Sequence, residues 1–85
     1  MSDAPHSHES GERLVAMAND IGRYFDSEPD QATGAAGVAD HLKRFWEPTM
    51  RKQIAAHLAA GGVGLEPLAK KGIERLVEID GKLHA

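Results

Sequence analysis

Cysteine is absent from the 85 residues of this chain. Without thiolates the chain has no disulfide, no zinc–thiolate site, no iron–sulfur ligands and no cysteine nucleophile. It also lacks any run near the roughly 18 apolar residues that a membrane-spanning helix needs. The first eleven residues are polar and do not have the pattern of a secretory signal. We therefore expect a cytoplasmic protein that does not contact a membrane.

Positive charge is also scarce, since the net charge is −3, and this argues against a dedicated nucleic-acid binder. The basic residues are unevenly distributed: Lys43, Arg44, Arg51 and Lys52 surround the single acid Glu47. Most of these charges are interpreted as a solvated helix surface. The alternative is a local basic patch that meets an acidic partner surface.

The length is enough for one domain only. Residues 1–11 are rich in Ser, His, Asp and Gly, which predicts a disordered tail. Residues 12–85 are predicted to form a single helical domain, whose first helix begins near Ser10 as N-cap.

Apolar residues recur at three- and four-residue steps in four successive segments, with no alternating strand pattern. This predicts an all-α fold, a small bundle of about four short helices. The four apolar faces are Leu14, Met17, Ala18, Ile21 and Phe25; Ala35, Val38, Ala39, Leu42, Phe45 and Trp46; Met50, Ile54, His57 and Leu58; and Leu68, Ala69, Gly72, Ile73, Leu76 and Val77. The second face is wide for a helix with only one neighbour.

Proline and glycine positions predict the boundaries between these helices. Pro48 disfavours helical geometry in the residue before it and suits the first position of a new helix. The sequence F-W-E-P is therefore a tight corner between the second and third helices. Gly61-Gly62 is expected to end the third helix in left-handed geometry. Pro67 is expected to lie in the first turn of the fourth helix, and Gly81 to end it.

No pattern of catalytic or metal-binding residues emerges. His41 and His57 lie in predicted helices, but neither has an acidic residue three or four positions away. Both are interpreted as packed or capping residues. The serines lie in the tail or a turn, and the glycines at 61, 62 and 64 have no G-K-[ST] after them. We predict no catalytic, cofactor-binding or metal site in this chain.

Aromatic residues are few, and two of the four are adjacent at the corner. Because neighbours on a helix point about 100° apart, Phe45 and Trp46 cannot both face the centre of one small core. In one interpretation Trp46 fills the core and Phe45 covers its rim. In the other, Phe45 or Trp46 anchors a partner, with Arg44 and Arg51 beside it.

The corner also resembles a known family. The segment from His41 to Arg51, with its H-x-x-x-F-W-[DE]-P-x-M string, is similar to the delta subunit of soluble NAD-dependent formate dehydrogenase. Two further segments, residues 17–21 and 64–68, resemble the same family and occur in its order. Thr49 departs from the pattern, where a basic residue is expected.

The resemblance implies a non-catalytic accessory subunit that supports assembly or stability by docking on the large catalytic subunit. Formate would be oxidised to CO2 in that subunit at a bis-molybdopterin Mo or W cofactor. Electrons would then pass through iron–sulfur clusters to FMN and NAD in other subunits, and no cofactor would lie in this chain. The residues predicted to contact the partner are His41, Arg44, Phe45, Trp46, Pro48, Met50 and Arg51.

Two other functions fit the residue pattern. The second and third helices with basic residues at their corner are similar to a helix-turn-helix, which would make the chain a small DNA-binding regulator. Alternatively, the isolated chain forms a homodimer that buries the same apolar stripe against itself.

Overall fold

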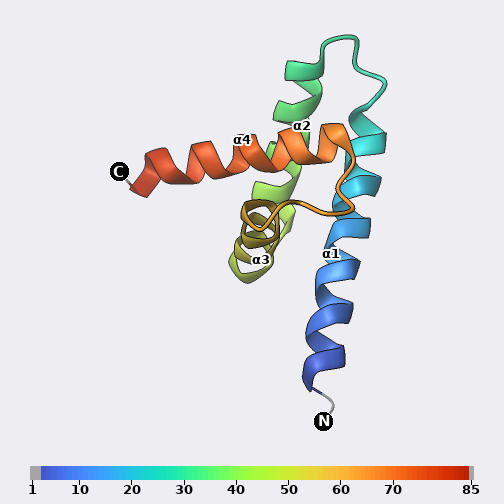
Figure 1. The fold of residues 1–85 in the computed structure, drawn as a ribbon. Coiled ribbons are helices and arrows are strands. Elements are labelled where there is room, and N and C mark those ends of the chain that lie inside the picture. The colour runs from blue at the N-terminus through green and yellow to red at the C-terminus, as the bar shows by residue number, and fades with distance from the viewer. Residues whose placement is uncertain (1–2, 85) are drawn as a thin grey trace.

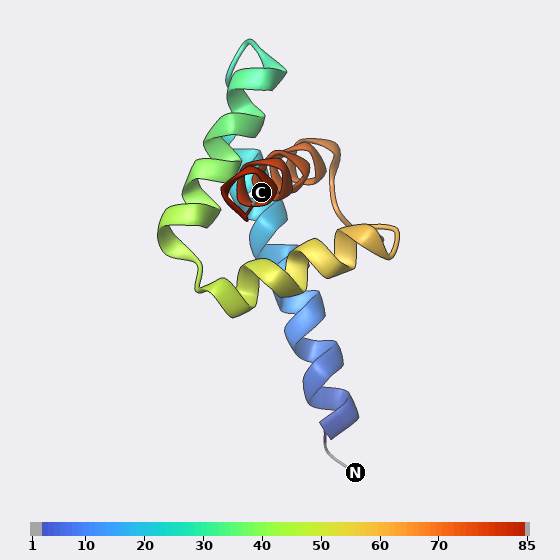
Figure 2. The same cartoon turned by 90° about the vertical axis from the view of Figure 1, so that its left-hand side faces the viewer.

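The computed structural model describes the backbone of residues 3–84 and the side chains of residues 11–81. Within this part the fold is all-helical, as predicted, with no strand. The helices are α1 (Asp3–Phe25), α2 (Gln31–Phe45), α3 (Pro48–Ala59) and α4 (Pro67–His84). They do not run side by side. Instead α4 crosses both α1 and α2, and the N-terminal turns of α1 extend beyond the other helices (Figures 1 and 2).

The first helix begins earlier than expected, at Asp3 rather than near Ser10. Pro5 falls in its first turn, where a missing backbone N–H is tolerated because the first N–H groups have no intrahelical acceptor. Residues 1–2, and the side chains before residue 11, lie outside the described part. The disordered tail over 1–11 and the domain boundary at residue 12 stay predictions.

Asp30 and Thr33 are the two N-cap candidates that the sequence offers for the second helix, and the structure uses the first. Asp30 is its N-cap, and the Asp30 carboxylate accepts a hydrogen bond from the Ala32 N–H at 3.2 Å. The Thr33 hydroxyl donates to the other carboxylate oxygen at 3.1 Å. One acidic side chain thereby accepts from a free backbone N–H of the first turn and from a side-chain hydroxyl, and its charge favours the positive helix end.

The corner between α2 and α3 has the predicted geometry. Trp46 and Glu47 both take extended conformations, with ψ of 142° and 153°. Pro48 is the first residue of α3. The ring of Pro48 excludes helical geometry at Glu47, so the chain leaves one helix and enters the next within two residues.

The glycines after α3 behave as expected, whereas the glycine in α4 does not. Gly61 and Gly62 have φ of +126° and +67°, and the Gly62 N–H donates to the His57 carbonyl at 2.9 Å. This is a left-handed helix end. The prediction that Gly81 stops α4 is wrong, because the helix continues to His84. A lone glycine costs a helix only about 1 kcal/mol, and no breaker follows it here.

The core lies where α4 meets α1 and α2, and α3 closes it from one side. Its buried apolar residues are Leu14 and Ala18; Ala35, Val38, Ala39, Leu42 and Trp46; Ile54; and Leu68, Ala69, Ile73 and Leu76. All of them lie on the apolar faces predicted for the four helices. Partly buried side chains such as Met17, Phe25 and Leu58 pack around them.

Small residues allow the helices of this core to cross closely. A Cβ placed on Gly22 of α1 would lie 3.1 Å from the backbone nitrogen of Ala69 in α4. A Cβ on Gly72 of α4 would overlap the Val38 side chain of α2, with 2.5 Å to its Cβ. The glycine at each crossing therefore sets how near the two helix axes come.

A buried asparagine fixes the loop between α3 and α4. The Asn19 amide donates to the Gly64 carbonyl at 2.9 Å, and its oxygen accepts from the Glu66 N–H at 2.8 Å. Arg23, one turn later, forms an ion pair with the Glu66 carboxylate, and this hydrogen-bonded contact raises the pKa of the Arg23 guanidinium. Two of the family-like segments, 17–21 and 64–68, thus meet at this point.

Candidate docking surface

The two adjacent aromatic residues at the corner differ completely in exposure. Trp46 is 6% exposed and belongs to the core, whereas Phe45 is 69% exposed. The prediction that both cannot face one core is confirmed. Trp46 takes the core position, as the first interpretation had it. Phe45 leaves most of its side chain in solvent, so it covers little of the rim of the core.

The ring of Phe45 packs against an aromatic neighbour on its own helix. The His41 ring, one turn earlier on α2, lies with its centroid 4.8 Å from that of Phe45, tilted by 46°. His41 itself is half-buried. This stacking restricts the rotamers of Phe45 while its outer face stays free, which lowers the entropy cost of presenting an aromatic ring to a partner.

The two arginines beside the corner have different roles. Arg44 is exposed and forms an ion pair with Asp40, one turn earlier on α2, at 3.1 Å. Arg51 of α3 is half-buried and donates from Nη1 to the Lys43 carbonyl at 2.8 Å. Arg51 thus satisfies a free carbonyl in the last turn of α2. It ties α3 to α2 across the corner.

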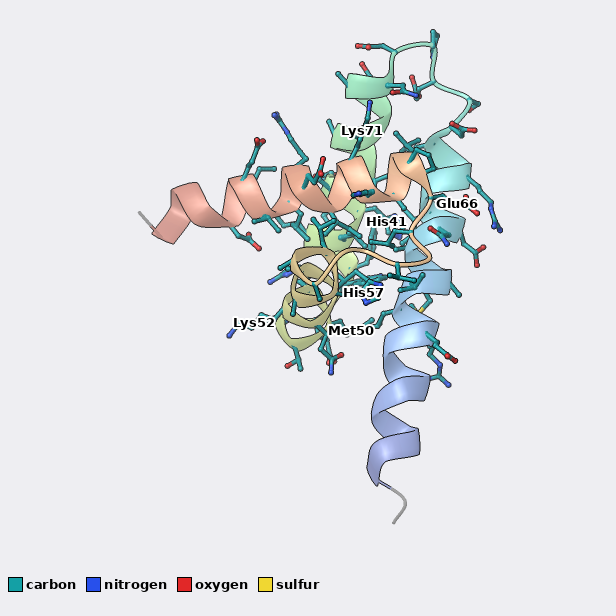
Figure 3. All side chains as sticks on the ribbon, in the orientation of Figure 1. His41, Met50, Lys52, His57, Glu66 and Lys71 are labelled. Carbon is teal, nitrogen blue, oxygen red and sulfur yellow. The ribbon has the colours of Figure 1, made fainter. Side chains whose placement is uncertain are left out.

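The two remaining predicted contact residues, Met50 and Pro48, also differ in exposure. Met50 is half-buried and packs against the core near the foot of α3 (Figure 3). Pro48 is exposed and lies at one end of a groove between α3 and α4. The predicted set therefore combines exposed side chains with buried or half-buried side chains that stabilise the corner. Their role as partner contacts stays a prediction.

The wide apolar stripe of α2 has a structural explanation that the sequence did not reveal. The helix packs against α4 on one side and against α1 on the other. For example, a Cβ on Gly37 would overlap the Phe25 ring of α1. Two neighbours account for nearly the whole stripe, and only Phe45 at its end is left over. The width of the stripe is therefore not in itself evidence for a partner.

Sequence patterning missed one further exposed apolar residue. Val77 of α4 was expected on the buried stripe but is 44% exposed. It lines the groove between α3 and α4 that Pro48 also lines. No periodicity signal separates Val77 from its buried neighbours, because its exposure depends on where the other helices end.

The helical histidines have packing roles in the described structure. His57 is half-buried, and its Nε2 donates to the Val63 carbonyl at 2.7 Å. This hydrogen bond holds the loop after α3 against the helix. This agrees with its interpretation as a capping residue. Within the described residues no three His, Cys, Asp or Glu side chains are placed to hold a metal ion. No described helix is long and apolar enough to cross a bilayer.

Comparison with known proteins agrees with the sequence resemblance. A family model described as the NADH-dependent formate dehydrogenase delta subunit matches residues 13–73 of the chain. The matched span contains the corner, Phe45 and the Asn19 contacts with the loop. Neither the curated proteins nor the solved structures contain a match to this chain.

Proposed function

Because the chain belongs to the NADH-dependent formate dehydrogenase delta subunit family, we propose that it is a non-catalytic accessory subunit of such a complex. It docks on the large catalytic subunit and supports assembly or stability of the whole. The complex operates in the cytoplasm and oxidises formate to CO2 with NAD as electron acceptor.

The observation that carries the docking role is the exposure of Phe45. A phenylalanine with most of its ring in water is unfavourable for an isolated chain, since burying such a side chain is worth about 1.5–3 kcal/mol. It also stacks on His41 and lies at the corner where Arg51 ties α3 to α2. Preorganised aromatic side chains of this kind are common binding hot spots.

The donor groups of this chain agree with an accessory role. Iron–sulfur clusters require thiolate ligands, and the chain has no cysteine. We therefore assign the iron–sulfur clusters, the bis-molybdopterin Mo or W centre, FMN and NAD to the other subunits. The contribution of this chain is a surface, with Phe45 at its centre.

A paired substitution tests the proposal. Phe45→Ala should reduce co-purification of the catalytic subunit by about tenfold or more, the effect expected when a hot spot is truncated. Tyr24→Ala is the matched control, because Tyr24 is an equally exposed aromatic residue (77%) at the far end of α1. Both variants are co-expressed with the other subunits, and formate-dependent NAD reduction is measured on the purified complexes.

Three results separate the alternatives. Loss of association in Phe45→Ala alone supports the proposal. Equal association and activity in both variants would contradict the role of the corner. If the wild-type chain itself never co-purifies with the catalytic subunit, the accessory role is wrong. In that case sedimentation of the isolated chain tests the homodimer, and retention on duplex DNA at low salt tests the regulator.

A further inference from the structure

A groove runs between α3 and the C-terminal half of α4, next to the corner but separate from Phe45 itself. On α3 it is lined by Pro48, Arg51, Lys52 and Ala55, which follow the i, i+3, i+4, i+7 spacing of one helix face. On α4 it is lined by Val77 and Asp80, with the buried Leu76 at its floor. Two helix faces thus form its walls.

This groove differs in charge from two other hollows of the described surface. Between α2 and α4 the lining carries two bases and two acids, Lys71, Arg75, Glu74 and Glu78. Between α1 and α4, Arg23 is already paired with Glu66 across the hollow. The α3–α4 groove instead has Arg51 and Lys52 against a single acid, on otherwise apolar walls.

Of the two basic residues that line the groove, Lys52 is the one available to an occupant. Arg51 already donates to the Lys43 carbonyl, whereas Lys52 is exposed and has no ion pair among the described residues. Figure 3 shows Lys52 projecting from α3 beneath the C-terminal half of α4. A carboxylate on an occupant of the groove would therefore find an unpaired partner at its edge.

The geometry of the walls selects the kind of occupant. An added β-strand needs a sheet edge, and residues 3–84 contain no strand. A polyproline segment needs a groove lined by aromatic rings, and no aromatic side chain lines this one. A seam between two helices, with apolar walls and a polar edge, matches the apolar face of a third helix.

We propose that this groove receives an amphipathic helix of the large catalytic subunit, with an acidic side chain of that helix directed at Lys52. The proposal rests on the accessory role proposed above and adds a second contact to it. Val77 supplies the apolar centre of this contact and Lys52 supplies its charge selectivity.

Substitution of Val77 by a charged residue tests the apolar part of the proposed contact. Val77→Asp should weaken association with the catalytic subunit by about tenfold or more, since it replaces the apolar side chain of the contact by a carboxylate that competes with the acidic side chain of the partner for Lys52. Val63→Asp is the matched control, because Val63 is 78% exposed in the loop between α3 and α4 and lies outside the groove. Circular dichroism and thermal unfolding of each isolated chain verify that both variants fold.

Two substitutions of Lys52 test the charged part of the proposed contact. If the occupant carries an acid, Lys52→Glu weakens association more than Lys52→Ala does, because it adds repulsion to the loss of the ion pair. Equal effects of the two substitutions would overturn the acidic contact. Normal association of a folded Val77→Asp chain would overturn the groove, and it would leave the accessory role standing if Phe45→Ala still dissociates.

The same variants distinguish a second copy as occupant. If Val77→Asp converts a dimer of the isolated chain to a monomer and leaves the complex with the catalytic subunit intact, the groove is a self-interface and the proposal is wrong. Analytical ultracentrifugation of the wild-type and Val77→Asp chains gives this result directly.

Discussion

At the residue scale, the molecule is defined by the different environments of Phe45 and Trp46. Helical geometry predicts that two neighbours diverge by about 100°. It does not predict which of the two is buried, because that depends on where α1 and α4 lie around α2. The tertiary packing places Trp46 inside and leaves Phe45 outside. The sequence therefore identifies Phe45 and Trp46 together as candidate partner contacts, and the structure shows that Phe45 is the exposed one.

The burial of Trp46 predicts a large stability effect. Trp46→Ala removes a core side chain and leaves a cavity, so it should lower the free energy of unfolding by about 3–5 kcal/mol. Phe45→Ala is the adjacent control and should change it by less than about 1 kcal/mol, since its ring is mostly solvated. Urea unfolding of the two isolated chains checks this. Equal stabilities would mean that Trp46 is not a core residue.

At the element scale, helix boundaries marked by a strong local signal were predictable and those without one were not. The carboxylate of Asp30 and the ring of Pro48 act on their immediate neighbours, and both define the helix ends expected of them. The start of α1 and the end of α4 were misjudged. No strong helix breaker lies at either place, so the predicted boundaries rested on the weak preferences of Ser10 and Gly81.

The crossing of α2 and α4 predicts opposite effects for two glycines in one helix. Gly72→Ala places a methyl group against the branched Val38 side chain and should destabilise the chain by about 1–3 kcal/mol through overpacking. Gly81→Ala meets nothing within 4 Å and should stabilise it by about 0.5–1 kcal/mol through helix propensity. Thermal unfolding compares them, and equal melting temperatures would contradict the close crossing.

At the scale of the whole molecule, the outer and the middle family-like segments serve different purposes. Asn19 joins α1 to the loop at Gly64 and Glu66, which positions the start of α4. The corner segment supplies Phe45 and one wall of the α3–α4 groove. Neither the Asn19 contacts nor the groove can be read from helical periodicity. Both depend on contacts between residues far apart in the sequence.

Protection of Phe45 in the assembled complex tests the docking function most directly. Hydroxyl-radical labelling of the aromatic side chains is compared between the isolated chain and the complex with the catalytic subunit, with Tyr24 as internal reference. Both rings are largely exposed in the free chain, at 69% and 77%. Docking at the corner predicts that Phe45 labelling falls severalfold on assembly while Tyr24 labelling is unchanged. Equal labelling of Phe45 in the free chain and the complex would contradict it.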